Sequence, residues 1–172
     1  MQSRRGKSML LDDYEISSAT QAIVPISEDK TMVYEEEGEY IVSKSSNQII
    51  NYNCNFYGSS YDGRCEGTRS LLGIKSKLPI IIEESRNIIF FPTSSVRRKQ
   101  SNWIALNKVK SYHKDDKNSY IIFTDGRKVN FDVSVFSIEN QFYRATLLKS
   151  KLADRKLINK EILENEEKNS QK

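Results

Sequence analysis

The period of the apolar residues changes once along this chain, and that change most constrains the fold. Up to residue 133, short apolar runs alternate with turn-forming residues, which is typical of β-strands. From residue 138 on, apolar residues recur at steps of three and four, as in an amphipathic helix. They are Ile138, Phe142, Ala145, Leu148 and Leu152. Strands followed by a helix predict an α+β fold, mainly an antiparallel β-sheet with an amphipathic C-terminal helix packed on it.

The turn residues indicate which runs pair. Gly38 lies in an acidic turn between two runs, and Asp125-Gly126 is a two-residue turn signal of the primed type. The expected strands are 21–26, 30–36, 39–43, 46–58, 78–85, 86–93 and 102–113, followed by the hairpin 119–133. Ser137 can cap the helix that is expected over 138–155.

Three segments are expected along the 172 residues. Residues 1–11 are interpreted as a flexible N-terminal arm. Residues 12–155 are long enough for one domain with its own core. Residues 156–172 form a charged tail that is expected to be disordered.

Composition excludes several classes of protein. There is neither a membrane-length apolar stretch nor the apolar segment of a signal peptide, so a cytoplasmic protein is expected. Cys54 and Cys65, with only one histidine in the chain, cannot form a four-ligand zinc site. We therefore expect two free thiols, no metal and no cofactor.

The glycine-rich stretch NFYGSSYDGRCEGT, residues 55–68, is interpreted as a loop. Gly58 and Gly63 have the spacing of a phosphate-binding loop, but Arg64 and Cys65 occupy the positions of its lysine and hydroxyl residue. Cysteine is a poor ligand for magnesium, so an NTPase is not expected. The single histidine, His113, lies in a polar stretch interpreted as an exposed turn, so no catalytic pair and no enzyme are predicted.

The basic charge is concentrated in the middle of the chain. The net charge is −4 in residues 1–56, +6 in residues 57–112 and +2 in residues 113–172. Such clustering favours an anionic partner, namely nucleic acid, an acidic protein or a membrane surface, although a solvated basic surface has the same pattern. The sequence contains no recognition-helix pattern, zinc finger or basic zipper, so loops or strands would contact DNA.

Several blocks of the sequence resemble the competence transcription factor family, ComK. They are CNFYGSSYDGRCEGT (54–68), KLPIIIEESRNIIFFPTSS (77–95), NWIAL (102–106) and ENQFYRATLLKSKLADR (139–155). The resemblance covers residues 12–155 in the same order. It implies a DNA-binding activator of genes for DNA uptake and genetic transformation. Such an activator would bind AT-rich promoter boxes, largely through the minor groove, as dimers and pairs of dimers.

The resemblance implies double-stranded DNA as the partner, with RNA polymerase as a further candidate, and a nucleoid-associated location when DNA is bound. The proposed DNA-binding residues share cationic or hydroxyl groups that can contact phosphates. They are Ser59, Ser60, Tyr61, Arg64, Arg69, Lys75, Lys77, Arg97, Arg98 and Lys99. Gly58, Gly63 and Gly67 are interpreted as structural loop residues that permit a close approach. Asn140, Gln141 and Arg144 either tie the helix to the sheet or form a subunit contact, and the first role is favoured.

The sequence departs from the family pattern in one respect, and one alternative function fits it. Better-known family members carry a longer C-terminal region with an apolar-aromatic segment that an adaptor binds, whereas this tail has no aromatic residue. Control by that adaptor is therefore not expected to carry over. The alternative function is a non-catalytic β-rich interaction module whose basic surface binds an acidic protein or an anionic surface.

Overall fold

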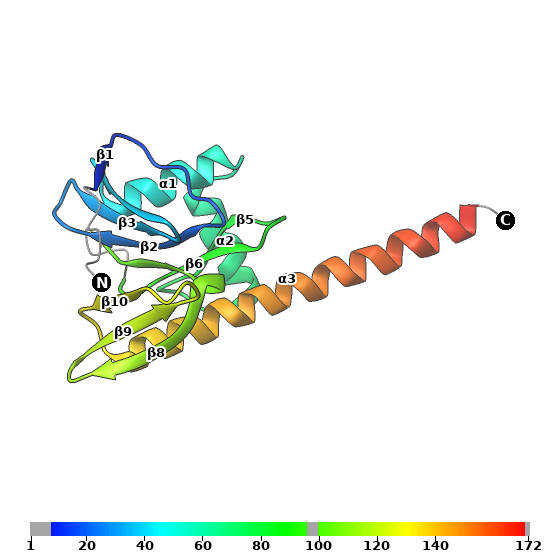
Figure 1. The fold of residues 1–172 in the computed structure, drawn as a ribbon. Helices are drawn as coiled ribbons and strands as arrows, with labels where there is room; N and C mark the ends of the chain where they lie inside the picture. The colour runs from blue at the N-terminus through cyan, green and yellow to red at the C-terminus, as the bar shows by residue number, and fades with distance from the viewer. Residues whose placement is uncertain (1–7, 96–99, 171–172) are drawn as a thin grey trace.

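The structure is a computed structural model that describes residues 8–95 and 100–170. Within these ranges it has two sheets and three α-helices, and the predicted α+β fold is confirmed (Figure 1). The larger sheet has the order β1-β4-β3-β2-β7-β6-β5, and the smaller has the order β10-β9-β8. All neighbouring strands are antiparallel except β1 and β4.

The elements have the following bounds. The strands are β1 (Met9–Leu11), β2 (Thr20–Pro25), β3 (Thr31–Glu35), β4 (Gly38–Val42), β5 (Ile80–Glu83), β6 (Ile88–Pro92), β7 (Trp103–Ala105), β8 (Val109–Asp115), β9 (Asn118–Phe123) and β10 (Lys128–Phe131). The helices are α1 (Ser46–Phe56), α2 (Tyr61–Leu72) and α3 (Val135–Ser170), with a short 3-10 helix, η1 (Leu106–Lys108).

The larger sheet separates two apolar cores. Phe90 and Trp103 face a core that α1 and α2 cover. The next residues along the same strands, Phe91 and Ile104, face a second core that α3 and the smaller sheet cover. Because successive side chains of a strand point to opposite faces, a strand buried on both faces has an unbroken apolar run such as Ile88–Pro92. The helices therefore lie on both sides of this sheet.

Residues 46–56, which the sequence indicated as a strand, form α1, and that prediction is wrong. Ser45 and Gln48 form a reciprocal capping box at its N-terminus. Its buried residues Ile49, Ile50, Asn53 and Cys54 recur at helical spacing. The Asn53 side chain accepts from the Ile16 backbone N–H at 2.7 Å and so attaches the N-terminal segment to α1.

Most of the expected glycine-rich loop is also helical, because residues 61–72 form α2. The Ser60 Oγ accepts from the Gly63 N–H at 3.0 Å, which caps the N-terminus. Gly73 ends the helix in the left-handed conformation (φ 67°), and its N–H donates to the Arg69 carbonyl at 2.8 Å. The expectation of a loop is correct only for residues 57–60, where Gly58 has φ 78°.

Two further details differ from expectation. The segment 102–113 contains two strands in different sheets, β7 and β8, joined by η1. The β9–β10 hairpin is confirmed, but its turn is not of the two-residue primed type. Phe123 and Arg127 pair through a backbone hydrogen bond of 2.9 Å, and of residues 124–126 only Gly126 has a positive φ, 87°. This is a three-residue loop that ends in a left-handed glycine.

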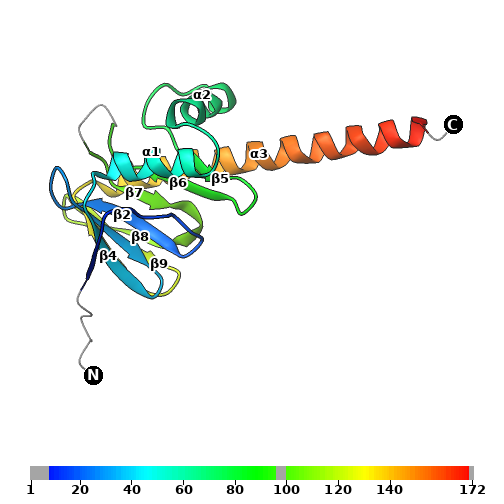
Figure 2. The ribbon, with the colours of Figure 1, turned by 90° about the horizontal axis from the view of Figure 1, so that it is seen from above.

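The C-terminal helix is longer than the expected 138–155. Ser134, not Ser137, caps α3: the Ser134 Oγ accepts from the Ser137 N–H at 3.3 Å. The helix continues to Ser170, through most of the expected charged tail, and α3 projects beyond the body (Figure 2). Of the expected arm, Met9–Leu11 form β1, and residues 1–7 lie outside the described ranges. No described helix is long and apolar enough to cross a membrane.

Candidate nucleic-acid interface

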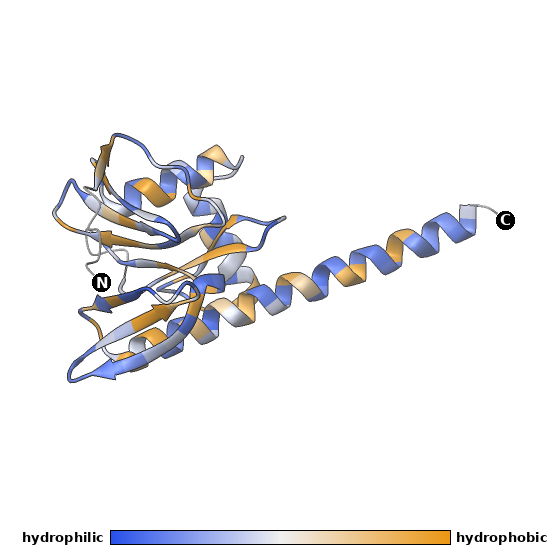
Figure 3. Ribbon diagram, viewed as in Figure 1, coloured by the Kyte–Doolittle hydropathy of each residue, from blue (hydrophilic) through white to orange (hydrophobic). Residues whose placement is uncertain are grey.

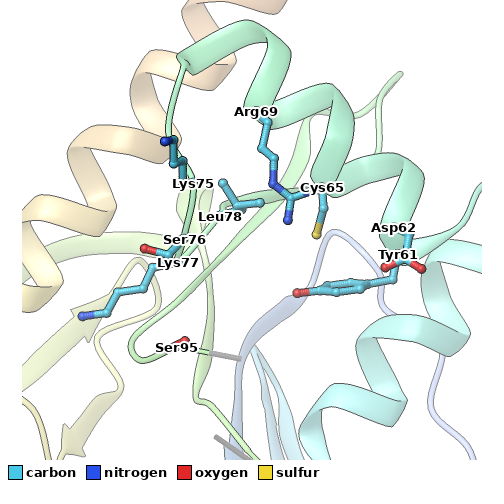
Figure 4. A pocket seen from close by; sticks show the side chains of 9 residues that line it. All are labelled: Tyr61, Asp62, Cys65, Arg69, Lys75, Ser76, Lys77, Leu78 and Ser95. Carbon is cyan, nitrogen blue, oxygen red and sulfur yellow. The ribbon is translucent and has the colours of Figure 1, made fainter. Parts of the chain in front are cut away.

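A pocket of about 250 Å³ opens between α2 and the segment that leads into β5 (Figure 4). It gathers four of the proposed DNA-binding residues, Tyr61, Arg69, Lys75 and Lys77. The other lining residues are Asp62, Cys65, Ser76, Leu78 and Ser95. Three cationic side chains and two serine hydroxyls thus surround one cavity that contains a single carboxylate.

Local structure explains why these residues meet. Arg69 lies in the last turn of α2, and Gly73 then reverses the chain toward β5. The buried Thr68 Oγ1 donates to the Pro79 carbonyl at 2.8 Å, which fixes α2 against the start of β5. Lys77 has φ 52°, a left-handed conformation that is uncommon for a residue with a side chain.

The anchored part of α3 holds the pocket segment in place. The Gln141 Nε2 donates to the Lys77 carbonyl and to the Pro92 carbonyl, both at 2.8 Å. The Arg144 Nη1 donates to the Ser76 carbonyl at 3.0 Å. These bonds are the helix-to-sheet attachment expected of Gln141 and Arg144, whereas Asn140, of which the same was expected, is exposed on the helix surface. Since they end on the backbone of residues 76 and 77, they fix the segment that carries the two lysines.

Two lining groups that could ionise, the Tyr61 phenol and the Cys65 thiol, are neutral. Burial raises the pKa of the Tyr61 phenol and of the Cys65 thiol, so both are protonated at neutral pH. A protonated thiol is a weak nucleophile. Among the described residues, no group of three or more His, Cys, Asp or Glu could hold a metal ion. The three cations and the neutral hydroxyl groups of the lining suit the pocket to binding an anion.

The cations have two orientations. The Tyr61 and Arg69 side chains and the Cys65 thiol point into the pocket, whereas the ammonium groups of Lys75 and Lys77 point away from them (Figure 4). Arginine can donate two parallel hydrogen bonds to a phosphate, and lysine acts as a mobile point charge. This arrangement fits one phosphate at Arg69 and further phosphates along the outer side, as on a nucleic-acid strand.

Arg64 lies apart from the other cations. It does not line the pocket, and its positive charge influences the Cys54 thiol of α1. Burial raises the pKa of the Cys54 thiol to about 11, and the charge of Arg64 only partly opposes that rise. Both cysteines are free, as expected. The structure thus separates Arg64 from the three cations with which the sequence grouped it.

The remaining candidates have varied surroundings. Ser59 and Ser60 precede α2, and the Ser60 hydroxyl is used as its cap. A Cβ on Gly63 would lie 3.0 Å from the Ser60 Oγ, whereas one on Gly67 would meet nothing within 4 Å. Arg97, Arg98 and Lys99 lie outside the described residues, beginning two positions after Ser95 at the pocket.

The sequence reasoning missed several lining residues and misplaced one side chain. Ser76 lies between two predicted lysines, so its position was a usable signal. Ser95 and Asp62 join the pocket only through tertiary folding. His113 is not in a turn but in β8, where its ring stacks on Tyr120 with centroids 4.9 Å apart.

A family model described as ComK protein matches residues 11–157. A curated relative, the competence transcription factor of Bacillus subtilis (strain 168), is 34% identical over 149 residues, which cover 84% of this chain and 78% of the relative. No solved structure matches the chain significantly.

Proposed function

The chain belongs to the ComK protein family, and from this premise we propose that it is a DNA-binding transcriptional activator of competence genes. It binds double-stranded DNA at AT-rich promoter boxes, through the minor groove. The observation that carries the proposal is the convergence of Arg69, Lys75 and Lys77 around one open pocket.

The physical argument rests on the type of contact that these groups make. Arginine, lysine and hydroxyl groups supply most protein contacts to the phosphate backbone, and these contacts position a protein on the duplex. A narrow AT-rich minor groove has an enhanced negative potential that attracts arginine. Arg97 and Arg98 follow Ser95 closely in the chain, so the pocket would bind the backbone while that segment enters the groove.

The direct test is a gel-shift titration of the purified chain. It compares an AT-rich duplex that contains paired boxes with a GC-rich duplex of equal length, at low and moderate salt. We expect tighter binding to the AT-rich duplex and a steep loss of affinity with salt, because each phosphate contact releases counterions. Equal, weak binding to both duplexes would contradict the proposal.

Charge-removing variants locate the interface. Arg69→Ala with Lys77→Ala should lower affinity for both duplexes and reduce the salt slope by about 1 for each lost phosphate contact. Arg97→Ala with Arg98→Ala should in addition reduce the preference for AT-rich DNA. Lys114→Ala with Lys117→Ala, at exposed positions of the β8–β9 hairpin, also removes two positive charges and serves as the matched control.

The second candidate function is an interaction module for an acidic protein or anionic surface, which the same cations favour. Competition separates the two, since specific duplex DNA would not displace such a partner. As an activator, the chain would also assemble on DNA as a homodimer or higher oligomer and contact RNA polymerase. Both partners belong to the proposal and are tested by sizing the DNA complex and by promoter transcription in a purified system.

A further inference from the structure

A second pocket, of about 270 Å³, lies on the solvent side of α1. Its lining residues are Asn47, Gln48 and Asn51 of α1 and Tyr61 of α2. Tyr61 also lines the basic pocket that contains Arg69, and its hydroxyl points into that pocket (Figure 4). The two pockets therefore meet at one tyrosine side chain. We call the pocket on α1 the carboxamide pocket.

Helical spacing explains why one face of α1 carries these amide side chains. Asn51 is four residues after Asn47 and three after Gln48, so the three are neighbours on the helix surface. Ile49 and Ile50 are buried in the core beneath the helix. Figure 3 shows this division as hydrophilic and apolar residues that alternate along α1. The surface of the carboxamide pocket is nevertheless mostly apolar, with the amide groups as its polar part.

The fully buried Trp103 holds two walls of the carboxamide pocket in place. Its Nε1 donates to the Asn47 Oδ1 at 3.1 Å. Its ring also packs edge-on against the Tyr61 ring, with centroids 6.4 Å apart. Asn51 is exposed, and its side chain hydrogen-bonds to no other residue in the described ranges. The pocket thus has a fixed frame, and the Asn51 carboxamide is available to a ligand.

The two pockets differ as the two ends of a nucleotide differ. The basic pocket suits a phosphate, since arginine donates two parallel hydrogen bonds to it. The mostly apolar pocket suits a flat ring, which would pack against Tyr61 as bases pack on aromatic side chains. A carboxamide donates and accepts in one plane and so pairs with N6 and N7 of adenine. Neither pocket alone reaches the roughly 300 Å³ at which ligand pockets begin, whereas the two together exceed it.

We propose that the two pockets form one binding site for a free adenine nucleotide. The phosphate binds at Arg69, the base occupies the carboxamide pocket with its edge at Asn51, and the Tyr61 side chain lies between them. Binding forms and breaks no covalent bond. A free nucleotide is favoured over a base of duplex DNA, because a paired base reaches such a pocket only after costly unstacking and unpairing.

The nucleotide site overlaps the proposed DNA contact only in the basic pocket. A bound nucleotide places its phosphate at Arg69, where the DNA backbone would otherwise bind, so the two ligands exclude each other. The nucleotide would then act as an inhibitor of DNA binding. This regulation rests on the proposed function, whereas the nucleotide site does not, because it requires no DNA.

The first experiment is calorimetric titration of the full chain, without DNA, with adenosine 5′-monophosphate (AMP). We expect a dissociation constant on the order of 0.1 mM for a ligand of this size. Adenosine and inorganic phosphate should each bind at least about tenfold more weakly, because each occupies only one pocket. Cytidine 5′-monophosphate (CMP) carries the same phosphate but lacks the adenine edge, so it should also bind about tenfold more weakly.

Variants on α1 test the base pocket separately from the phosphate pocket. Asn51→Ala should weaken AMP binding about tenfold through the lost pairing and leave the affinity for duplex DNA unchanged. Alanine favours the helix, and circular dichroism checks that the fold is kept. Asn55→Ala, at an exposed position one turn further along that lines neither pocket, is the matched control and should bind AMP normally. Arg69→Ala should weaken binding of both AMP and DNA.

Competition tests the overlap of the two ligands. In the gel-shift titration, AMP at ten times its dissociation constant should lower the apparent affinity for the AT-rich duplex about tenfold. CMP at the same concentration has the same charge and controls for ionic strength, and it should lower the affinity by less than about twofold. In Asn51→Ala the effect of AMP should fall to that of CMP.

Three results would overturn the inference. The first is AMP binding no tighter than that of CMP and inorganic phosphate, which would leave only a basic pocket. The second is an Asn51→Ala chain that binds AMP as tightly as the unmodified chain. The third is AMP binding that leaves the affinity for DNA unchanged. A chain that binds duplex DNA but not AMP would reject this site alone, whereas one that binds AMP but not DNA would reject the proposed function alone.

Discussion

The two halves of α3 share one spacing but differ in what the spacing serves. In the anchored half, residues 135–152, the stripe of threes and fours is buried against both sheets, and Gln141 bonds the pocket segment. In the projecting half, residues 153–170, the corresponding positions Arg155, Asn159, Ile162 and Glu166 are exposed. The comparison shows that the three- and four-residue spacing predicts the helix. The type of residue at each of these positions then decides whether the helix packs on the body of the protein there.

A leucine in each half tests this difference most directly. Leu148 is fully buried, so Leu148→Ala should lower the free energy of unfolding by about 3 kcal/mol through lost burial and an added cavity. Leu163 is 59% exposed, so Leu163→Ala should change it by less than about 0.5 kcal/mol. Urea denaturation at low protein concentration, where a dimer dissociates, measures both. Equal losses would show that the projecting half also packs on the body.

The next variant removes the link between the anchored half and the pocket. Gln141→Leu leaves the carbonyls of Lys77 and Pro92 without their shared donor, which should cost about 2 kcal/mol of stability. It should also weaken DNA binding, because the segment that carries Lys75 and Lys77 is no longer fixed.

The matched control for this variant is Asn140→Leu, on an exposed neighbouring position. We expect it to change neither stability nor affinity. A Gln141→Leu chain that is less stable but binds DNA with unchanged affinity would separate the pocket from the DNA interface.

How much could be predicted from the sequence differs between these regions. Strands with clear turns, such as those around Gly38 and Asp125-Gly126, were predictable because local chemistry decides them. Residues 46–56 were not: their buried Ile49, Ile50 and Asn53 fit a helix, but an apolar run of this length is ambiguous without its capping box.

The candidate site was predictable in composition but not in arrangement. Arg69, Lys75 and Lys77 were chosen for their charge, and they do line one pocket. Arg64 carries the same charge but does not line the pocket, and its charge influences Cys54 instead. In a helix each successive side chain is turned by about 100°, so neighbouring residues of α2 face different sides, whereas a loop imposes no such pattern. The helical structure of residues 61–72 therefore decides which of these cations share the pocket.

A substitution at Lys77 separates the effect of backbone strain on stability from the effect of charge on DNA binding. Lys77 lies in the pocket segment that the anchored half of α3 holds in place. Its φ of 52° is unfavourable for a residue with a Cβ, so Lys77→Gly should raise stability by about 1 kcal/mol. The same change removes a cation, so affinity for DNA should fall. Thermal unfolding and gel-shift titration give the two readouts. Lys75→Gly, at an exposed neighbouring position whose φ is not positive, should lower affinity without raising stability.

The exposed face of α2 differs from that of the projecting half. It carries Gly67, which has no side chain, whereas the projecting half carries large exposed apolar side chains. Gly67 lies in the interior of α2, and a Cβ there would meet no atom within 4 Å. Gly67→Ala should therefore stabilise the fold by about 0.5–1 kcal/mol. We expect affinity for DNA to fall nonetheless, since the added methyl group can collide only with a ligand. Ser70→Ala, one turn further along, is the control. Unchanged affinity in Gly67→Ala would confine the DNA contact to the pocket and exclude this face of α2.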